Sequence, residues 1–279
     1  MSLTADEPSY LEMTRSVIRA LAYFTHEAMQ QGLEPMRLAR TGFALFASGC
    51  SRSAPFPGHA LASYLTATQQ HDGGWADVEE TLWCLGYLSV FGDKYDVHLA
   101  NGRNWLTSVR LPCGAWGKSE RDQPRIPVTA LATVLVPEIV NTSAIAWLKS
   151  EWEGDLAGLV QLTYKGAFFL LATRHPRFTN ADGLIDRTFS YLFKEQEEDG
   201  GFGPWKGHPA GSDPWSTGVV LWGLSKFQSS IPTEIVERAL SWFQSKQLPD
   251  GLWPHHYLDD GAAMALIGIS DVLHHRLEK

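Results

Sequence analysis

The chain has 279 residues, of which 44% are hydrophobic, so it can bury a substantial core as one large domain or two small ones. The net charge of −8, without clustered Lys or Arg, excludes the basic surface that nucleic-acid binding requires. The polar start MSLTADEPSY does not resemble a signal peptide, and no long apolar run predicts a membrane span. We therefore expect a cytoplasmic protein with at most peripheral membrane contact.

Apolar residues recur at the i, i+3, i+4 spacing of amphipathic helices, and strand-like alternation is nowhere sustained. Each amphipathic segment, predicted to be an outer helix, is followed by a segment that is apolar on all sides and is expected to be buried. In chain order the predicted pairs are residues 10–32 with 35–48, 59–70 with 79–91, a third pair with inner helix 128–136, 142–151 with 156–173, 184–196 with 216–227, and 234–247 with 261–269.

A turn motif repeats between the helices of these pairs. Gln69-x-x-Asp72-Gly-Gly-Trp75 recurs as Gln196 to Phe202 and as Gln247 to Trp253, and a weaker copy ends at Trp116. Trp116 lies 41 residues after Trp75, and Trp253 lies 51 after Phe202, so the period is roughly 40 to 50 residues. Gln and Asp in such a turn can satisfy backbone groups at helix ends, which predicts a structural role for the motif.

Six pairs leave no region for a second domain. We therefore predict an all-α fold with a single domain over residues 1–279, a closed (α/α)6 toroid of six outer and six inner helices. The N-termini of the inner helices are expected to converge at one mouth. The three cysteines, Cys50, Cys84 and Cys113, have neither disulfide nor metal spacing and are expected to be reduced thiols that pack as small apolar side chains.

The repeated turns resemble the QW motifs of squalene-hopene cyclases and related class II terpene cyclases, a superfamily that also contains protein prenyltransferase β subunits. The resemblance covers nearly the whole chain. The cyclases carry Asp-x-Asp-Asp-Thr at the start of an inner helix, with the middle Asp as proton donor. Asp77-Val78-Glu79-Glu80-Thr81 is similar, with Glu replacing two Asp, and opens the second predicted inner helix.

The next inner helix supports and qualifies the resemblance. Pro127-Val128-Thr129 is similar to the family's Asp-Val-Thr segment, with Pro in place of Asp. Leu131 stands where the family often has a His that hydrogen-bonds the acid, so we expect a different proton supply. At the places of the prenyltransferase zinc ligands the chain has Asp213-Pro214-Trp215 and Gly261, so no zinc site of that kind is expected.

A carboxylic acid that protonates an alkene must hold its proton at rest and still be a strong acid toward substrate. Burial and a neighbouring carboxylate raise its pKa, whereas a helix N-terminus stabilises the conjugate base by about 0.3 to 2 kcal/mol. Glu79 is the predicted acid because Trp83 lies one turn further on the same helix face, and Asp77 and Glu80 are predicted to tune it. Asp77 and Glu80 also form a capping-box pattern, so a purely structural role is the alternative.

A second acidic pair, Asp259 and Asp260, opens the sixth inner helix beside His255 and His256. It is the alternative proton donor, and N-capping by Asp259 is its structural alternative. Asp213 is predicted to be an N-cap of the fifth inner helix.

Carbocations inside a toroid would be stabilised by aromatic faces, at roughly 0.5 to 2 kcal/mol per cation–π contact. The candidate substrate-binding residues are aromatic side chains on or beside inner helices: Trp83, Phe168, Trp215, Trp222, Trp253 and Tyr257. Core packing is the alternative for each. Cations in the mouth loops could receive a carboxylate or diphosphate head group, although solvated loop charges are the commoner explanation: Lys118, Arg121, Arg125, Lys206 and His208.

The sequence therefore predicts a class II terpene or meroterpenoid cyclase that protonates a polyprenyl chain, with a small isoprenoid or prenylated molecule as its partner. No Asp-Asp-x-x-Asp motif is present, so we expect no metal and no cofactor, with Mg²⁺ needed only for a diphosphate substrate. Two alternatives remain open: a glycosidase of the same architecture, with Glu79 and Asp259 as paired carboxylates, and a non-catalytic lipid-binding toroid.

Overall fold

The computed structural model describes residues 7–49, 58–159, 161–179 and 183–277. Within these residues all the regular elements are helices, which confirms the predicted all-α class. The outer helices are α1 (Glu7–Gln30), α3 (Gly58–Thr68), α5 (Asp96–Ser108), α7 (Thr142–Ala157), α9 (Leu184–Glu195) and α11 (Thr233–Lys246). The inner helices are α2 (Pro35–Ala47), α4 (Val78–Ser89), α6 (Ile126–Leu135), α8 (Thr163–Ala172), α10 (Pro214–Leu224) and α12 (Leu258–Leu277). Short 3₁₀ helices in the described residues follow three of the inner helices: η2 (Gly92–Tyr95), η3 (Pro137–Ile139) and η4 (Ser225–Phe227).

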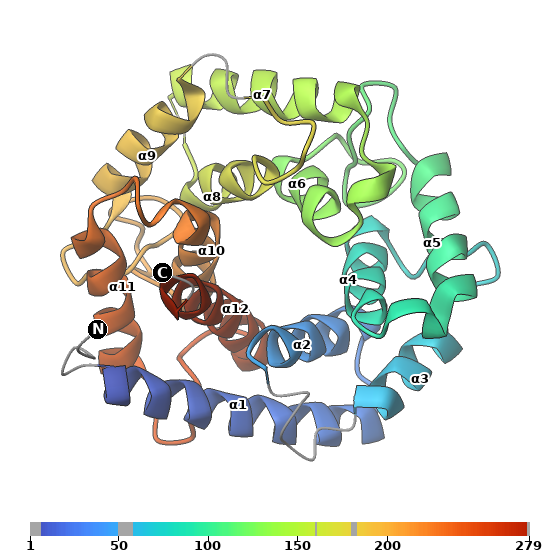
Figure 1. Cartoon of the computed structure of the whole chain (residues 1–279), viewed down its shortest axis with the longest axis horizontal. Helices are drawn as coiled ribbons and strands as arrows, with labels where there is room; N and C mark the ends of the chain where they lie inside the picture. The colour runs from blue at the N-terminus through green and yellow to red at the C-terminus, as the bar shows by residue number, and fades with distance from the viewer. Residues whose placement is uncertain (1–6, 50–57, 160, 180–182, 278–279) are drawn as a thin grey trace.

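Figure 1 shows the helices as two concentric rings, with the inner helices packed side by side and the outer helices around them. The last inner helix, α12, packs against the first, α2, and α1 packs against α11, so the ring closes on itself. The predicted toroid is therefore confirmed. Some helix boundaries were wrong. The helix α8 begins at Thr163 rather than at residue 156, because α7 continues beyond residue 151 to Ala157, with Gly158 as its C-cap. The helix α12 (Leu258–Leu277) extends beyond the predicted residues 261–269 at both ends.

The repeated turns join neighbouring helical pairs through the same set of hydrogen bonds. Gln247 Nε2 donates to the carbonyl of Gly251 in its own turn (2.9 Å) and to the carbonyl of Met13 on α1 (3.1 Å). Gln69 and Gln196 make the equivalent two bonds within their own turns and to the following outer helix. The motif is therefore a link between adjacent pairs, and its last copy closes the ring.

The Trp of the motif connects the outer ring to the inner ring. Nε1 of Trp75, Trp116 and Trp253 each donates to a carbonyl ten residues earlier on the preceding outer helix, at 3.1, 2.7 and 2.7 Å. The backbone N–H of Trp75 donates to Thr81 Oγ1 (2.9 Å), and that of Trp116 to Thr129 Oγ1 (3.0 Å), so the same residues are fixed to the next inner helix. These bonds set the inner helices at a common level, with their N-termini at one end of the ring.

The remaining expectations concern the cysteines and the membrane. Cys84 is buried on α4 and Cys113 is exposed, and both are free thiols, whereas Cys50 lies outside the described residues. Over the described ranges, no helix combines the length and the apolar character needed to cross a bilayer.

Candidate active site

The first turns of four inner helices meet at one end of the ring, which we call the mouth. Arg37 on α2 contacts Asp259 on α12, and the backbone N–H of Met36 on α2 donates to Glu80 on α4. His255, just before α12, lies 3.9 Å from Asp213 at the start of α10, measured from Nε2 to Oδ1. The predicted convergence of inner-helix N-termini therefore brings charged residues of distant sequence segments together.

Asp77 and Glu80 form the capping arrangement at the start of α4. Asp77 is the N-cap, and its Oδ1 accepts a hydrogen bond from the backbone N–H of Glu80 (2.8 Å). Glu80 Oε1 accepts from the N–H of Ala76 (3.0 Å), and its Oε2 accepts from the N–H of Met36 (3.2 Å). Both oxygens of Glu80 thus satisfy backbone donors, and the carboxylate links α4 to α2. This geometry matches the structural alternative for Glu80 rather than a tuning role.

Glu79, between these two residues, is placed differently. No hydrogen bond joins its carboxyl group to any other side chain or backbone group that the structure describes, and the side chain is half-buried. Burial raises the pKa of Glu79, and the negative charges of Asp77 and Asp260 act in the same direction, while Arg40 and Lys118 oppose them. The result is a carboxyl group that keeps its proton to higher pH than usual and is still reached by solvent.

Arg40 lies beside this acid and was not identified from the sequence. Its side chain on α2 is buried, an Nη1 hydrogen bond ties it to Asp260, and its Cζ lies 5.4 Å from the centre of the Trp83 ring. Its Nε has no hydrogen-bond partner. An Arg within a largely apolar segment that is predicted to be an inner helix is the sequence signal that could have found it, since Arg is rarely buried without a partner. The guanidinium is thus fixed between the two acidic helix starts of α4 and α12.

Asp259 and Asp260 are both held by arginines. Asp259 is only 2% exposed and accepts from Nε (2.9 Å) and Nη2 (2.5 Å) of Arg37, while Asp260 accepts from Arg40. Neither accepts a hydrogen bond from His255, whose Nδ1 faces the backbone of its own turn. The acid–histidine pair considered from the sequence is therefore not formed. The glycosidase alternative also loses its second carboxylate, because the oxygens of Asp259 are occupied.

Asp213 is confirmed as the N-cap of α10. Its Oδ1 accepts from the backbone N–H of Ser216 (2.8 Å) and its Oδ2 from the Ser216 hydroxyl (2.7 Å). Of the cations at the mouth, Arg125 is ion-paired through Nε with Asp122 (2.6 Å), and Lys118 is exposed. In the described part of the chain no cluster of three or more His, Cys, Asp or Glu side chains is arranged to hold a metal ion.

Aromatic side chains occupy the opposite side of the mouth. Trp215, in the first turn of α10, is half-buried and packs against Tyr164 (ring centroids 5.7 Å apart) and Phe168 (6.1 Å), both on α8. Burial raises the pKa of Tyr164, which the sequence-based prediction did not include. Trp83 on α4 and Trp222 on α10 are nearly fully buried and contact each other, with centroids 6.4 Å apart.

Two other candidate substrate-binding residues lie elsewhere. Trp253 is completely buried, packs edge-on against Phe243 of α11 and donates Nε1 to the carbonyl of that residue. The expectation of a substrate contact at Trp253 is corrected, because this residue fills the space between the two rings. Tyr257 is exposed at the rim, with the Cζ of Arg37 5.0 Å from the centre of its ring.

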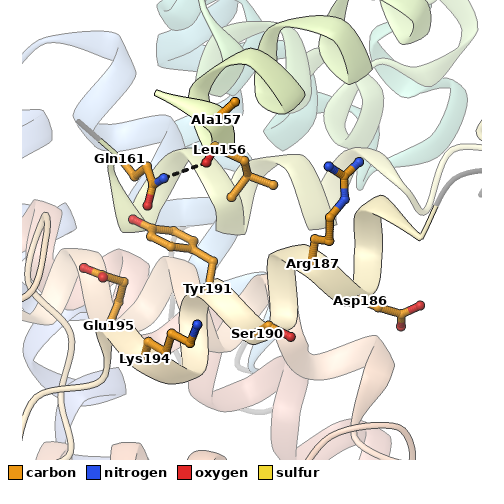
Figure 2. Close-up of a pocket in the computed structure, with 9 residues that line it drawn as sticks. All are labelled: Leu156, Ala157, Gln161, Asp186, Arg187, Ser190, Tyr191, Lys194 and Glu195. Atoms are coloured by element: carbon orange, nitrogen blue, oxygen red, sulfur yellow. Dashed lines mark hydrogen bonds between the residues drawn. The ribbon is translucent and has the colours of Figure 1, made fainter. Parts of the chain in front are cut away.

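A separate groove of about 480 Å³ lies between the outer helices α7 and α9 (Figure 2). It is lined by Leu156, Ala157, Gln161, Asp186, Arg187, Ser190, Tyr191, Lys194 and Glu195. The hydroxyl of Tyr191 has no hydrogen-bond partner, and burial raises its pKa. None of the candidate site residues lines this groove, so it is distinct from the mouth.

Solved structures with a similar fold include several forms of one type II terpene cyclase. A variant of the type II terpene cyclase MstE from Scytonema, in complex with its substrate geranylgeranyl dihydroxybenzoate, matches with a TM-score of 0.74 and 15% identity over 96% of this chain and 99% of that one. Another variant, with the product merosterolic acid A, matches with a TM-score of 0.74 and 16% identity over the same shares. A crystal structure of a protein from Actinoplanes matches with a TM-score of 0.69 and 13% identity over 93% of this chain and 99% of that one.

The sequence matches no protein-family model, and no curated protein is significantly similar to it. The structural likeness spans nearly the whole chain and establishes a class II terpene cyclase-like fold. The resemblance noted in the sequence is thereby supported at the level of the fold.

Proposed function

We propose that this protein is a class II terpene or meroterpenoid cyclase in which Glu79 is the proton donor. The observation that carries the proposal is the contrast within one helix turn: Glu80 is bound by backbone donors, whereas Glu79 has a raised pKa, no hydrogen-bond partner among the described residues and partial solvent exposure. A carboxyl group that keeps its proton to higher pH than usual and has no hydrogen-bond partner suits the protonation of an alkene.

In the first step the O–H bond of Glu79 breaks and its proton adds to the terminal alkene carbon, whose π electrons form the new C–H bond. The positive charge on the neighbouring carbon is attacked by the next alkene, which closes a ring. Glu79 is left as a carboxylate, which the charges of Arg40 and Lys118 and the N-terminus of α4 stabilise. Loss of a proton from carbon to water or a base ends the reaction, and solvent at the mouth returns a proton to Glu79.

Trp215, Tyr164 and Phe168 form the aromatic wall for the cationic intermediate in this proposal. Each ring face contributes roughly 0.5 to 2 kcal/mol to the stabilisation of a nearby cation. Aromatic rings also keep water from trapping the cation before the next ring closes. The proposed domain organisation, one toroid over the whole chain, encloses this site within a single ring.

The proposed substrate is a prenyl chain joined to a polar head group, as in the aromatic acid bound by MstE. The head group would remain at the mouth, where exposed Lys118 can pair with a carboxylate. Because the proton comes from a side chain, the reaction needs no metal unless the head group is a diphosphate.

The test is incubation in deuterated water with geranyl, farnesyl and geranylgeranyl hydroxybenzoates and with squalene, in the presence of EDTA, followed by mass spectrometry. We expect a cyclised product that carries one new deuterium. Glu79→Gln is expected to lower its rate by about 10²- to 10⁴-fold, since that is the usual contribution of a general acid. Glu80→Gln is the matched control and should retain activity at a temperature where it is folded. Deuterated product from Glu79→Gln at the wild-type rate would assign the proton donor to another residue.

A second candidate function is binding of a prenylated molecule without turnover. The observation that favours it is that capping contacts account fully for Asp77 and Glu80, two of the three carboxylates in the sequence that resembles the cyclase signature. Binding of the same compounds without deuterium incorporation in the wild-type protein would support this function and overturn the cyclase proposal.

A further inference from the structure

Two tryptophans from opposite sides close the middle of the inner ring. The inner helices pack in the order α2, α4, α6, α8, α10, α12 and back to α2, so α4 and α10 stand opposite each other (Figure 1). Six helices packed about 10 Å apart place opposite axes about 20 Å apart, a gap that only side chains can bridge. Trp83 of α4 and Trp222 of α10 do so, with ring centroids 6.4 Å apart and planes inclined by 31°.

The contact leaves almost no solvent-accessible surface on either ring. Trp83 is 1% exposed and Trp222 is 3% exposed, and Phe43 of α2 packs edge-on against Trp83 at 5.8 Å. The Nε1–H of Trp83 nevertheless has no hydrogen-bond partner. Buried indole N–H groups usually find an acceptor, so this unpaired donor distinguishes Trp83 from the Trp residues of the repeats, whose Nε1 groups are all bonded.

The tryptophan pair lies directly behind the proposed acid. Trp83 follows Glu79 by four residues on α4, which places it about 6 Å further from the mouth along the helix axis. Arg40 stands over the face of Trp83, and its charge also acts on Glu79, so the acid, its counter-ion and the tryptophan pair are neighbours. Solvent reaches Glu79 and Trp215 but hardly reaches the pair. A prenyl chain with its terminal alkene at Glu79 would therefore meet the two indoles before it could extend further along the axis of the ring.

We infer that Trp83 and Trp222 form the floor of the substrate chamber and select geranyl and farnesyl chains over the longer geranylgeranyl chain. The inference rests on the proposed function for the place where the ligand binds. A longer chain requires the two indoles to part, and forcing extra carbon atoms into a packed core distorts side chains and backbone. One surplus methylene in an apolar pocket already changes recognition by roughly 10- to 200-fold.

The experiment measures equilibrium binding of hydroxybenzoates that carry geranyl, farnesyl or geranylgeranyl chains, by titration calorimetry. The proteins are the wild type, Trp222→Ala, the milder Trp222→Leu, and Trp152→Leu. Trp152 is the matched control because it is also fully buried, but on α7, where its Nε1 is bonded to Thr188. Circular dichroism tests whether each variant is folded. If Trp222→Ala does not fold, Trp222→Leu is used in its place, because its side chain retains more of the apolar volume.

We expect the wild type to bind the farnesyl compound at least about tenfold more tightly than the geranylgeranyl compound. Trp222→Leu and Trp222→Ala should reduce or reverse this ratio, and Trp152→Leu should leave it unchanged. Equal affinities in the wild type, a ratio that Trp222 variants do not alter, or binding of none of the compounds would each overturn the inference. Deuterium incorporation is measured separately. Selective binding without turnover would therefore overturn the proposed cyclase function but would still support chain-length selection by Trp83 and Trp222.

Discussion

The guanidinium of Arg37 in the first turn of α2 holds both carboxylate oxygens of Asp259 in the first turn of α12, with Nε–Oδ2 and Nη2–Oδ1 distances of 2.9 and 2.5 Å. The two residues are 222 positions apart in the sequence, and their contact joins the last inner helix to the first. Asp259 is almost fully buried, and Arg37 is the counter-ion of its carboxylate.

Arg37→Ala should lower the free energy of unfolding by about 3 kcal/mol, because it leaves a buried carboxylate without its counter-ion. Arg187→Ala is the matched control: its pair with Glu153 is exposed on both sides, and such pairs contribute about 1 kcal/mol or less. Urea unfolding of both variants measures the difference. Equal losses would mean that the ring closes without this ion pair.

Glu79→Gln should stabilise the protein near neutral pH. The folded state raises the pKa of Glu79 above its ordinary value of 4.5, so the folded protein binds this proton more tightly than the unfolded chain does. The stability that this proton confers is fully present below pH 4.5 and is lost as the pH rises through the raised pKa. Gln avoids the loss, and we expect a gain in stability at pH 7 that disappears toward pH 4.

Thermal melts of the wild type, Glu79→Gln and the exposed control Glu120→Gln between pH 4 and 8 measure this gain. The rate of cyclisation should fall over the same rise in pH, because only protonated Glu79 can donate. A stability difference between wild type and Glu79→Gln that does not vary with pH would contradict the raised pKa.

Glu80→Ala should destabilise the protein by about 2 kcal/mol, because it leaves the backbone N–H groups of Ala76 and Met36 without acceptors. Hydrogen exchange should be faster at these two amides and little changed at distant inner helices. The result would separate the structural role of Glu80 from the proposed chemical role of Glu79. Unchanged exchange at Met36 would show that the link between α4 and α2 is not made by this carboxylate.

Gln247→Ala should cost about 1 to 2 kcal/mol, because its amide donates both to its own turn and to α1. Gln31→Ala, at an exposed position, is the control and should stay within about 0.5 kcal/mol of the wild type. Chemical denaturation measures both. If the two variants are equally stable, the hydrogen bonds of Gln247 do not contribute to the contact between the last helical pair and α1.

Gly200→Ala tests the close approach of the turn to the next outer helix. Gly200 has φ +96°, and an added Cβ would lie 2.6 Å from the carbonyl oxygen of Arg238. Gly207 has φ +73° with nothing within 4 Å of such a Cβ, so Gly207→Ala incurs only the backbone cost of about 1 to 2 kcal/mol. We expect Gly200→Ala to lose clearly more in a thermal melt. Equal melting temperatures would exclude the steric contribution.

The pattern of apolar residues and turns in the sequence was sufficient to predict the helical toroid. Alternating amphipathic and wholly apolar segments, separated by turns with Gln, Asp and Gly, predict paired helices in two layers. An amphipathic helix buries one face and an apolar helix buries its whole surface, so the distribution of apolar residues indicates the layer of each helix. The start of α8 was misplaced because the residues before it continue the helical pattern of α7 and carry no strong stop signal before Gly158.

The candidate site was only partly predictable. The sequence placed Asp77, Glu79 and Glu80 at one helix start and favoured Glu79 as the acid, but it left open whether Glu80 caps the helix or tunes the acid, since that depends on what packs beside it. The backbone donor of Met36, which fixes Glu80, comes from another helix. Trp253 was misassigned because an aromatic residue beside an inner helix can face either the ring's interior or the outer helices.

The sequence by itself determined the helical repeat, the turns that join the pairs and the acidic start of α4, because all three are set by residues close together in the chain. Only the tertiary structure decided which charges meet at the mouth. Arg37 with Asp259, Arg40 with Asp260, and Trp83 with Trp222 each join residues more than a hundred positions apart. Closure of the ring brings them together, and such contacts cannot be predicted from neighbouring residues because they depend on how the inner and outer helices are arranged in space.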